Sequence, residues 1–192
     1  MEYLVFLGMA ISLVGVISYI KDMLQGKAKP NRVSWLMWSI APLIATFAAL
    51  STGVTLAVIP VFMSGFGPLL VFTVSLFKKD AYWKLTKFDF FCGALSLLAL
   101  ILWYITKNPI IAIVFSILSD LLAAVPTIKK AWNHPESESS MAFIAGILSA
   151  ATSFFAIKEL GFTSLAFPIY LILVNICIIY SIEKNNLFKS NK

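Results

Sequence analysis

Charged residues are scarce in this chain, where they make up 12% of the 192 residues, against about 25% in an average soluble domain. Hydrophobic residues make up 60%, where about 45–50% is usual. So few charges could not cover so much apolar surface in water, which excludes an ordinary soluble domain and also intrinsic disorder. The composition is that of an integral membrane protein.

Cysteine and histidine are equally scarce. Cys92 and Cys177 lie in apolar stretches without a CxxC pattern, so we expect both to be buried structural residues. The single histidine, His134, has no partner with the spacing of a metal site or a catalytic triad. HExxH and GxSxG motifs are absent, as are paired carboxylates in the apolar runs. We therefore expect no enzymatic activity, no metal and no cofactor.

Seven apolar runs approach the length of about 20 residues that a helix needs to cross a membrane. Polar or turn-forming stretches separate them. We expect the first run to be retained, because no basic region precedes it and no small-residue cleavage pattern stands before Lys21. The predicted transmembrane helices are Tyr3–Ile20, Val33–Leu50, Val54–Phe77, Phe88–Thr106, Pro109–Ile128, Met141–Ile157 and Phe162–Ile182.

The basic residues predict how these helices are oriented. The chain has 15 Lys and Arg residues and a net charge of +6. If the N-terminus lies outside, all but Lys107 and Lys158 fall in inside segments, as the positive-inside rule requires. One missing span would invert every later loop. The pattern therefore predicts seven spans with the N-terminus outside and the C-terminus inside, and it explains the basic charge without a nucleic-acid partner.

The two halves of the chain show a weak internal repeat. A shift of 108 residues aligns the first inner loop with the third, so that Lys21 meets Lys129 and Trp35 meets Phe143. We predict two parallel three-helix repeats, residues 1–80 and 108–192, the second ending in a short cytoplasmic tail. The basic linker and inversion helix of residues 81–107 join them. Parallel repeats of this kind are a known transporter architecture.

The third inner loop carries a recognisable motif. The stretch Val125–Lys130, followed by Pro135–Phe143, resembles the PQ-loop signature of the SWEET and PQ-loop transporter superfamily, with Thr127 in place of the usual glutamine. The layout is also similar to that of the nicotinamide riboside transporters. The resemblance implies an alternating-access transporter of a small polar solute, in which Pro126 matches a hinge proline. Asn175 resembles the cargo-binding asparagine in the last helix of SWEETs.

Polar residues at membrane depth are the candidate binding residues. Asp120 is the only carboxylate well inside a run and lies nine residues before Lys129, about 13 Å from the inner end at 1.5 Å per residue. Asn175 lies eight residues before Glu183, at a depth of about 12 Å by the same rise. Ionisable groups at this depth are costly and are commonly functional. The alternative for both residues is a hydrogen bond that only holds helices together.

Two further residues complete the predicted site. Ser12 is the counterpart of Asp120 under the shift of 108 residues. Trp38 lies one turn deeper than Trp35, where its indole could stack on a sugar or a flat heterocycle, although lipid contact or packing is an equal alternative. We expect Trp35 itself to be an interfacial anchor. The predicted cavity is thus lined by Ser12, Trp38, Asp120 and Asn175.

These features predict an all-α integral membrane transporter for a sugar, a nucleoside-like vitamin or an amino acid. The alternative is a seven-helix receptor or sensor, or a structural partner protein, without flux. A retinal protein is excluded, because the last predicted span contains no lysine. The expected location is the plasma (inner) membrane of a prokaryote. Coupling to protons and assembly into homo-oligomers are left open.

Overall fold

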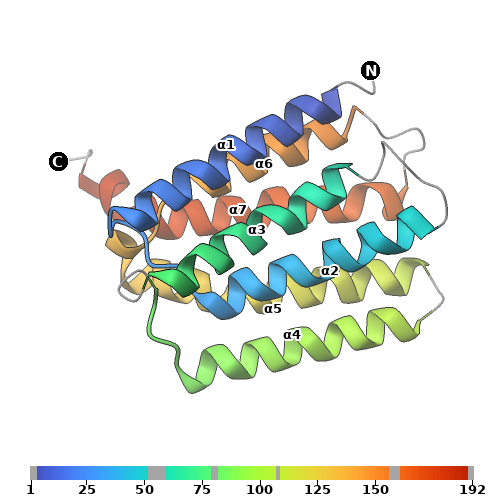
Figure 1. Ribbon diagram of the computed structural model, residues 1–192, viewed down its shortest axis with the longest axis horizontal. Helices are drawn as coiled ribbons and strands as arrows, with labels where there is room; N and C mark the ends of the chain where they lie inside the picture. Colours follow the sequence, from blue (N-terminus) through green and yellow to red (C-terminus); the bar gives the residue numbers. More distant parts are fainter. Residues whose placement is uncertain (1–3, 52–58, 79–81, 107–108, 156–160, 190–192) are drawn as a thin grey trace.

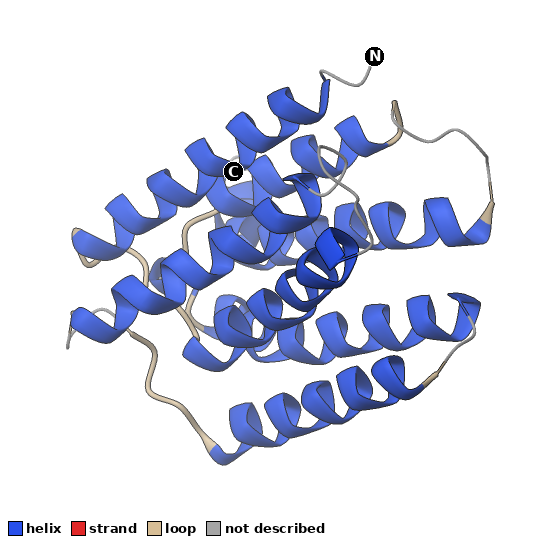
Figure 2. Ribbon diagram, turned by 45° about the vertical axis from the view of Figure 1, so that its right-hand side comes forward, coloured by secondary structure: helices blue, strands red, loops and turns tan. Residues whose placement is uncertain are grey.

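A computed structural model describes residues 4–51, 59–78, 82–106, 109–155 and 161–189 of the chain (Figure 1). Within these ranges, the regular structure consists of seven α-helices and one 3-10 helix, with no strand (Figure 2). The elements are α1 (Leu4–Leu24), α2 (Arg32–Ser51), α3 (Ile59–Phe77), α4 (Lys87–Ile105), α5 (Pro109–Asn133), η2 (Pro135–Ser137), α6 (Met141–Ser153) and α7 (Phe162–Lys189).

Each predicted run corresponds to one of these helices, so the all-α fold class is confirmed. Helices α1, α5 and α7 continue past the predicted ends at Ile20, Ile128 and Ile182. Hydropathy marks only the apolar part of a helix, whereas lysine and glutamate are good helix formers that prolong it into polar surroundings. The predicted outer turns around residues 52–53, 107–108 and 158–160 lie outside the described residues.

Consecutive helices run in opposite directions, and the two termini lie at opposite ends of the molecule (Figure 1). At the left-hand end in this view, α1, α3, α5 and α7 end while α2, α4 and α6 begin. We call this the basic end. Every Lys and Arg in the described part of the chain lies there, namely Lys21, Lys27, Lys29, Arg32, Lys78, Lys84, Lys87, Lys129, Lys130, Lys184 and Lys189.

The first set of three helices, α1–α3, and the second set, α5–α7, pack in the same order. Helix α3 lies against both α1 and α2, and α7 lies against both α5 and α6. Between the sets, α1 packs on α6 and α2 packs on α5, while α4 lies against α5 and α2. The Trp35 and Phe143 rings, 108 positions apart, have centroids 6.2 Å apart. These two positions, which the predicted repeat treats as equivalent, are therefore in contact.

Small residues bring α1 and α6 close together. A Cβ atom added at Gly15 would overlap the Cβ atom of Ala145, and one added at Gly8 would overlap the hydroxyl of Thr152. Small residues at helix contacts let backbones approach closely, which is the usual way in which helices associate in membranes. The α1–α6 contact therefore depends on glycine at both positions.

We expect Gly15→Ala to destabilise the protein by about 1–3 kcal/mol, because an added methyl group in a packed contact forces its neighbours apart. Thermal unfolding of the purified protein in detergent measures the effect. Gly161→Ala is the control, since an added Cβ atom there has no atom within 4 Å. Equal stability of the two variants would contradict this account of the α1–α6 contact.

Large apolar side chains cover much of the outer surface. Phe90 and Phe91 on α4 are 60% and 61% exposed, and Leu173 on α7 is 60% exposed. Among the described residues, two segments are long and apolar enough to cross a membrane, Phe6–Leu24 and Leu165–Lys184, and less than a third of either is buried within the protein. A signal sequence or a core helix can meet the same length criterion. The finding favours membrane insertion only weakly.

The structure corrects one expectation about the cysteines. Cys92 is buried as expected, but Cys177 is exposed. An apolar stretch does not reveal which residues of a helix face the protein, because this helix is apolar on all sides. The exposed side of α7 at this level also carries Ile176 and Tyr180.

Candidate functional site

Asp120 lies near the middle of α5, and its side chain is half-buried. The Tyr170 hydroxyl of α7 donates a hydrogen bond to Oδ2 of Asp120 at 2.7 Å. The indole Nε1 of Trp38, on α2, donates to the backbone carbonyl of Asp120 at 3.3 Å. The structure thus brings the predicted residues Asp120 and Trp38 together. It places them where the first and second sets of three helices meet.

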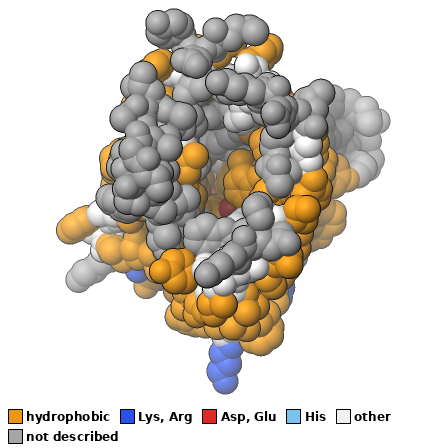
Figure 3. Space-filling model, turned by 90° about the vertical axis from the view of Figure 1, so that its right-hand side faces the viewer, with side chains coloured by type: hydrophobic (Ala, Val, Ile, Leu, Met, Phe, Trp, Pro, Cys, Tyr) orange, Lys and Arg blue, Asp and Glu red, His pale blue; other side chains and the backbone are white. Residues whose placement is uncertain are grey.

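The end of the molecule opposite the basic end is hollowed between the helices, and acidic atoms are visible at depth (Figure 3). The other acidic residues of the described ranges lie at the basic end, namely Asp22, Asp89, Glu136, Glu138 and Glu183. The ion pairs among the described residues do not include Asp120. A partly buried carboxylate without a counter-charge attracts a proton, a cation or a neutral hydrogen-bond donor.

The other two predicted binding residues do not join this cluster. Asn175 donates from Nδ2 to the carbonyl of Leu171 within α7 at 2.7 Å, and its side chain lies against Gly146 of α6. Ser12 is half-buried on α1, and the contacts found among the described residues do not connect it with Asp120.

Trp35 is not the interfacial anchor that its position suggested. It is 3% exposed, and its ring packs against Tyr19 with centroids 4.7 Å apart and against Trp38 with centroids 5.4 Å apart. Phe143 completes the group from α6. These aromatic rings fill the core between Asp120 and the basic end, because α2 turns its Trp35 face toward α1 and α6 rather than toward the outside.

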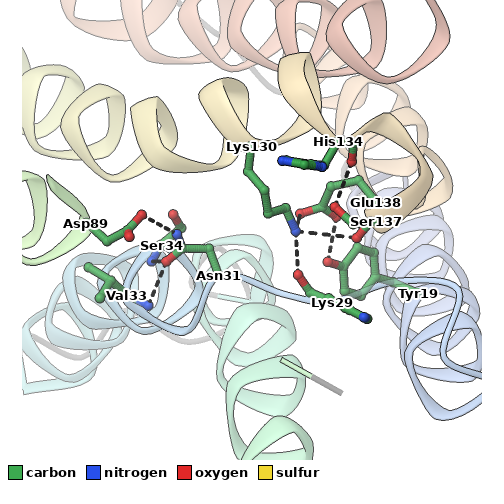
Figure 4. Close-up of polar contacts among 10 residues, drawn as sticks. All are labelled: Tyr19, Lys29, Asn31, Val33, Ser34, Asp89, Lys130, His134, Ser137 and Glu138. Atoms are coloured by element: carbon green, nitrogen blue, oxygen red, sulfur yellow. Dashed lines mark hydrogen bonds and ion pairs between the residues drawn. The ribbon is translucent and has the colours of Figure 1, made fainter. Parts of the chain in front are cut away.

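The basic end holds a group of polar contacts that we call the basic-end network, formed by the buried residues Tyr19, Lys130, Ser137 and Glu138 and the backbone of Lys29 (Figure 4). Lys130 Nζ and Glu138 Oε1 form an ion pair at 2.5 Å, with side chains 2% and 0% exposed. The Tyr19 hydroxyl donates to Glu138 Oε2 at 2.6 Å. Lys130 also donates to the carbonyl of Lys29, and the Lys29 amide donates to the Ser137 carbonyl at 2.8 Å.

Burial lowers the pKa of Lys130, which lies two residues beyond the predicted end of its span, and the Glu138 carboxylate acts in the opposite direction. A charged lysine in this position therefore depends on its partner. The network also connects the two halves of the molecule, because Tyr19 and Lys29 belong to the first set of helices and the other members to the second.

A second buried contact anchors the start of α2 to α4. Asn31 is 0% exposed, and its Oδ1 accepts hydrogen bonds from the amides of Val33 at 3.1 Å and Ser34 at 3.4 Å. Its Nδ2 donates to Oδ1 of Asp89 at 2.7 Å. Asp89 forms a capping box with Thr86 at the start of α4. Asn31 thus caps one helix and holds the first turn of another.

Known proteins do not help to identify this arrangement. No protein-family model, characterised protein or solved structure matches the chain. In the described part of the chain, no group of three or more His, Cys, Asp and Glu residues is placed to hold a metal ion. The geometry around Asp120 and the basic-end network is therefore what indicates a function.

Sequence reasoning missed Tyr170 and the role of Glu138. Tyr170 is one of several aromatic residues in apolar runs, and nothing in its neighbourhood indicates a partner 50 positions away. Glu138 belongs to the loop that carries the PQ-loop resemblance. An acidic residue eight positions after a lysine at a helix end was a signal for a local ion pair, although it did not show that the pair is buried.

Proposed function

We propose that the chain is an integral membrane protein with seven spanning helices, and that it carries a small polar solute across the membrane. The membrane assignment is supported by large exposed apolar side chains on the outer helices and by the gathering of the described Lys and Arg residues at one end. In this assignment the basic end faces the cytoplasm, and the location is the plasma (inner) membrane of a prokaryote.

The observation that carries the transport proposal is the placement of Asp120. Asp120 lies halfway along the bundle, where the two halves meet. Its carboxylate accepts a hydrogen bond from Tyr170, and its backbone carbonyl accepts one from Trp38. A hollow leads inward from one end (Figure 3), while the basic-end network closes the other. A central polar site that opens to one side only is what alternating access requires of a single conformation.

The solute proposed for this site carries hydrogen-bond donors. A carboxylate accepts hydrogen bonds, so hydroxyl groups of a sugar or a nucleoside-like vitamin and the ammonium group of an amino acid all suit Asp120. The carboxylate can instead take up a proton that moves with the solute. The parallel packing order of the two helix sets supports a rocking movement of one set against the other.

Two measurements test this function. A thermal-shift screen of purified protein against sugars, nucleosides and amino acids at two pH values finds the ligand, because binding to the folded state raises the melting temperature. Uptake of that ligand into liposomes that contain the protein then tests for transport. Binding without uptake would favour the receptor or sensor alternative, and absence of both would contradict a solute-binding role.

Pro126 is the proposed hinge in α5. It is buried within the helix, four positions before Lys130, and its ring removes the backbone hydrogen bond to residue 122, which permits bending. We expect Pro126→Ala to fold normally and to slow uptake of the solute in liposomes. Pro68→Ala in α3 serves as the control, because it removes a helix proline from a helix that contributes no residue to the basic-end network. Unchanged uptake by the Pro126 variant would contradict a hinge at this position.

A further inference from the structure

The basic-end network has the properties of a barrier between two compartments. Each of its contacts from Tyr19 and Lys29 joins the first set of helices to the second. Ser139 adds another, since its hydroxyl donates to Oδ2 of Asp22 at 2.6 Å. If one set of helices rocks against the other, these contacts must separate together. The charged side chains of Lys130 and Glu138 are 2% and 0% exposed in this arrangement, and Figure 4 shows the contacts that hold them.

Polar atoms without hydrogen-bond partners lie near this network and near the Asn31 contact. Among the described residues, the hydroxyls of Ser34 and Thr127 and the indole Nε1 of Trp35 are buried and have no hydrogen-bond partner. Ser34 is one turn along α2 from Asn31, and Thr127 is one turn along α5 before Lys130. A buried hydroxyl without a partner is unfavourable, so packing alone does not explain the polar groups here. Water would satisfy all of them if the basic end opened.

We infer that the Lys130–Glu138 ion pair, held by Tyr19 and the Lys29 carbonyl, is the gate that closes the basic end. When the gate opens, Ser34 and Thr127 line the hydrated passage from the central site to that end. The inference rests on the proposed function for its meaning. The gate has two stable states, closed with the pair intact and open with both charges hydrated. An arrangement in between is strongly disfavoured, because a charge that has lost its partner while still buried is not hydrated.

Thiol accessibility tests the gate without requiring transport. In a background with Cys92→Ala and Cys177→Ala, single cysteines are introduced as Thr127→Cys and Ser34→Cys, which retain the size of the original side chains. Detergent-purified protein is then treated with a water-soluble maleimide. In the intact gate we expect slow labelling. Adding Glu138→Gln should raise the rate at least about tenfold, because breaking a buried pair disfavours the closed state strongly.

The short helix η2, which directly precedes Glu138, provides a matched control. Glu136 pairs with His134 at 3.4 Å, but the two side chains are 73% and 52% exposed. Glu136→Gln removes the same charge two residues from Glu138, and we expect it to leave labelling within about twofold of the parent, because exposed pairs contribute little. Equal labelling rates in the Glu136 and Glu138 variants would overturn the proposed gate.

Two more variants separate opening from unfolding. Ser96→Cys reports on the buried α4–α5 contact, where Ser96 and Ser119 exchange hydrogen bonds at 2.8 and 2.9 Å, and it should stay protected in every gate variant. If Glu138→Gln also exposes the cysteine at position 96, that variant is unfolding, and the test is repeated with Tyr19→Phe. This milder change removes one hydroxyl of the gate and leaves the aromatic packing intact. Faster labelling at Thr127→Cys alone then supports the gate, and unchanged labelling overturns it.

An apolar replacement of the whole pair completes the test. Lys130→Met combined with Glu138→Leu removes both charges of the pair and leaves neither one buried without its partner, so labelling should return to the slow rate of the parent. Fast labelling in this variant would contradict a gate that depends on the ion pair. A protein that labels as expected but neither binds nor moves a solute would contradict the proposed function and leave the gate standing.

Discussion

Asp120→Asn is expected to abolish most binding and uptake of the solute. The substitution keeps the size of the side chain and an oxygen that can accept from Tyr170, and it removes only the charge. Since a hydrogen bond to a charged group contributes about 1.5–3 kcal/mol, binding should weaken by about ten- to hundredfold. Thermal shift and isothermal titration measure the affinity, and liposome uptake measures the flux.

The pH dependence of the same variant tests whether a proton moves with the solute. If Asp120 carries the proton, uptake by the parent protein responds to a pH gradient and uptake by the Asn variant does not. Glu136→Gln is the control, because it removes one exposed acidic charge far from the site. An Asp120→Asn variant that binds and transports normally at every pH would contradict both roles of the carboxylate.

Asn31→Ala is expected to destabilise the protein strongly. The variant loses the cap of α2, which contributes about 1 kcal/mol, and leaves the buried Asp89 without its Asn31 partner, which costs about 1–3 kcal/mol more. The free energy of unfolding should therefore fall by about 2–4 kcal/mol. Thermal or denaturant unfolding in detergent measures this loss.

Asn31→Ser separates the two roles. Serine still caps a helix well, but its short side chain does not reach Asp89, so we expect only the second part of the loss. Stability of the Ser variant equal to that of the Ala variant would show that the cap contributes nothing. Wild-type stability of the Ala variant would contradict the role given to Asn31 in joining α2 to α4.

The helices could be predicted because the signals are local. Every predicted run corresponds to a helix, since apolar stretches of this length and the polar breaks between them are read directly from neighbouring residues. The position of Asp120 along α5 followed in the same way, by counting residues from Lys129. The resemblance to PQ-loop and SWEET transporters is still a prediction, as are the seven membrane spans.

The rotation of each helix about its axis could not be predicted. Trp35 was expected at the interface and lies in the core, and Cys177 was expected in the core and is exposed. In a soluble helix a polar face shows which side is buried. Here both sides are apolar, so only contacts with neighbouring helices decide which residues face inward.

The sequence by itself determined an all-α, strongly apolar chain with its basic residues at alternate loops and a single carboxylate deep in one run. Only the tertiary structure decided what that carboxylate contacts, and which residues close the basic end. Tyr170 lies 50 positions from Asp120, and Tyr19 lies 119 positions from Glu138. Such contacts depend on how whole helices pack, and no local pattern of residues records that packing.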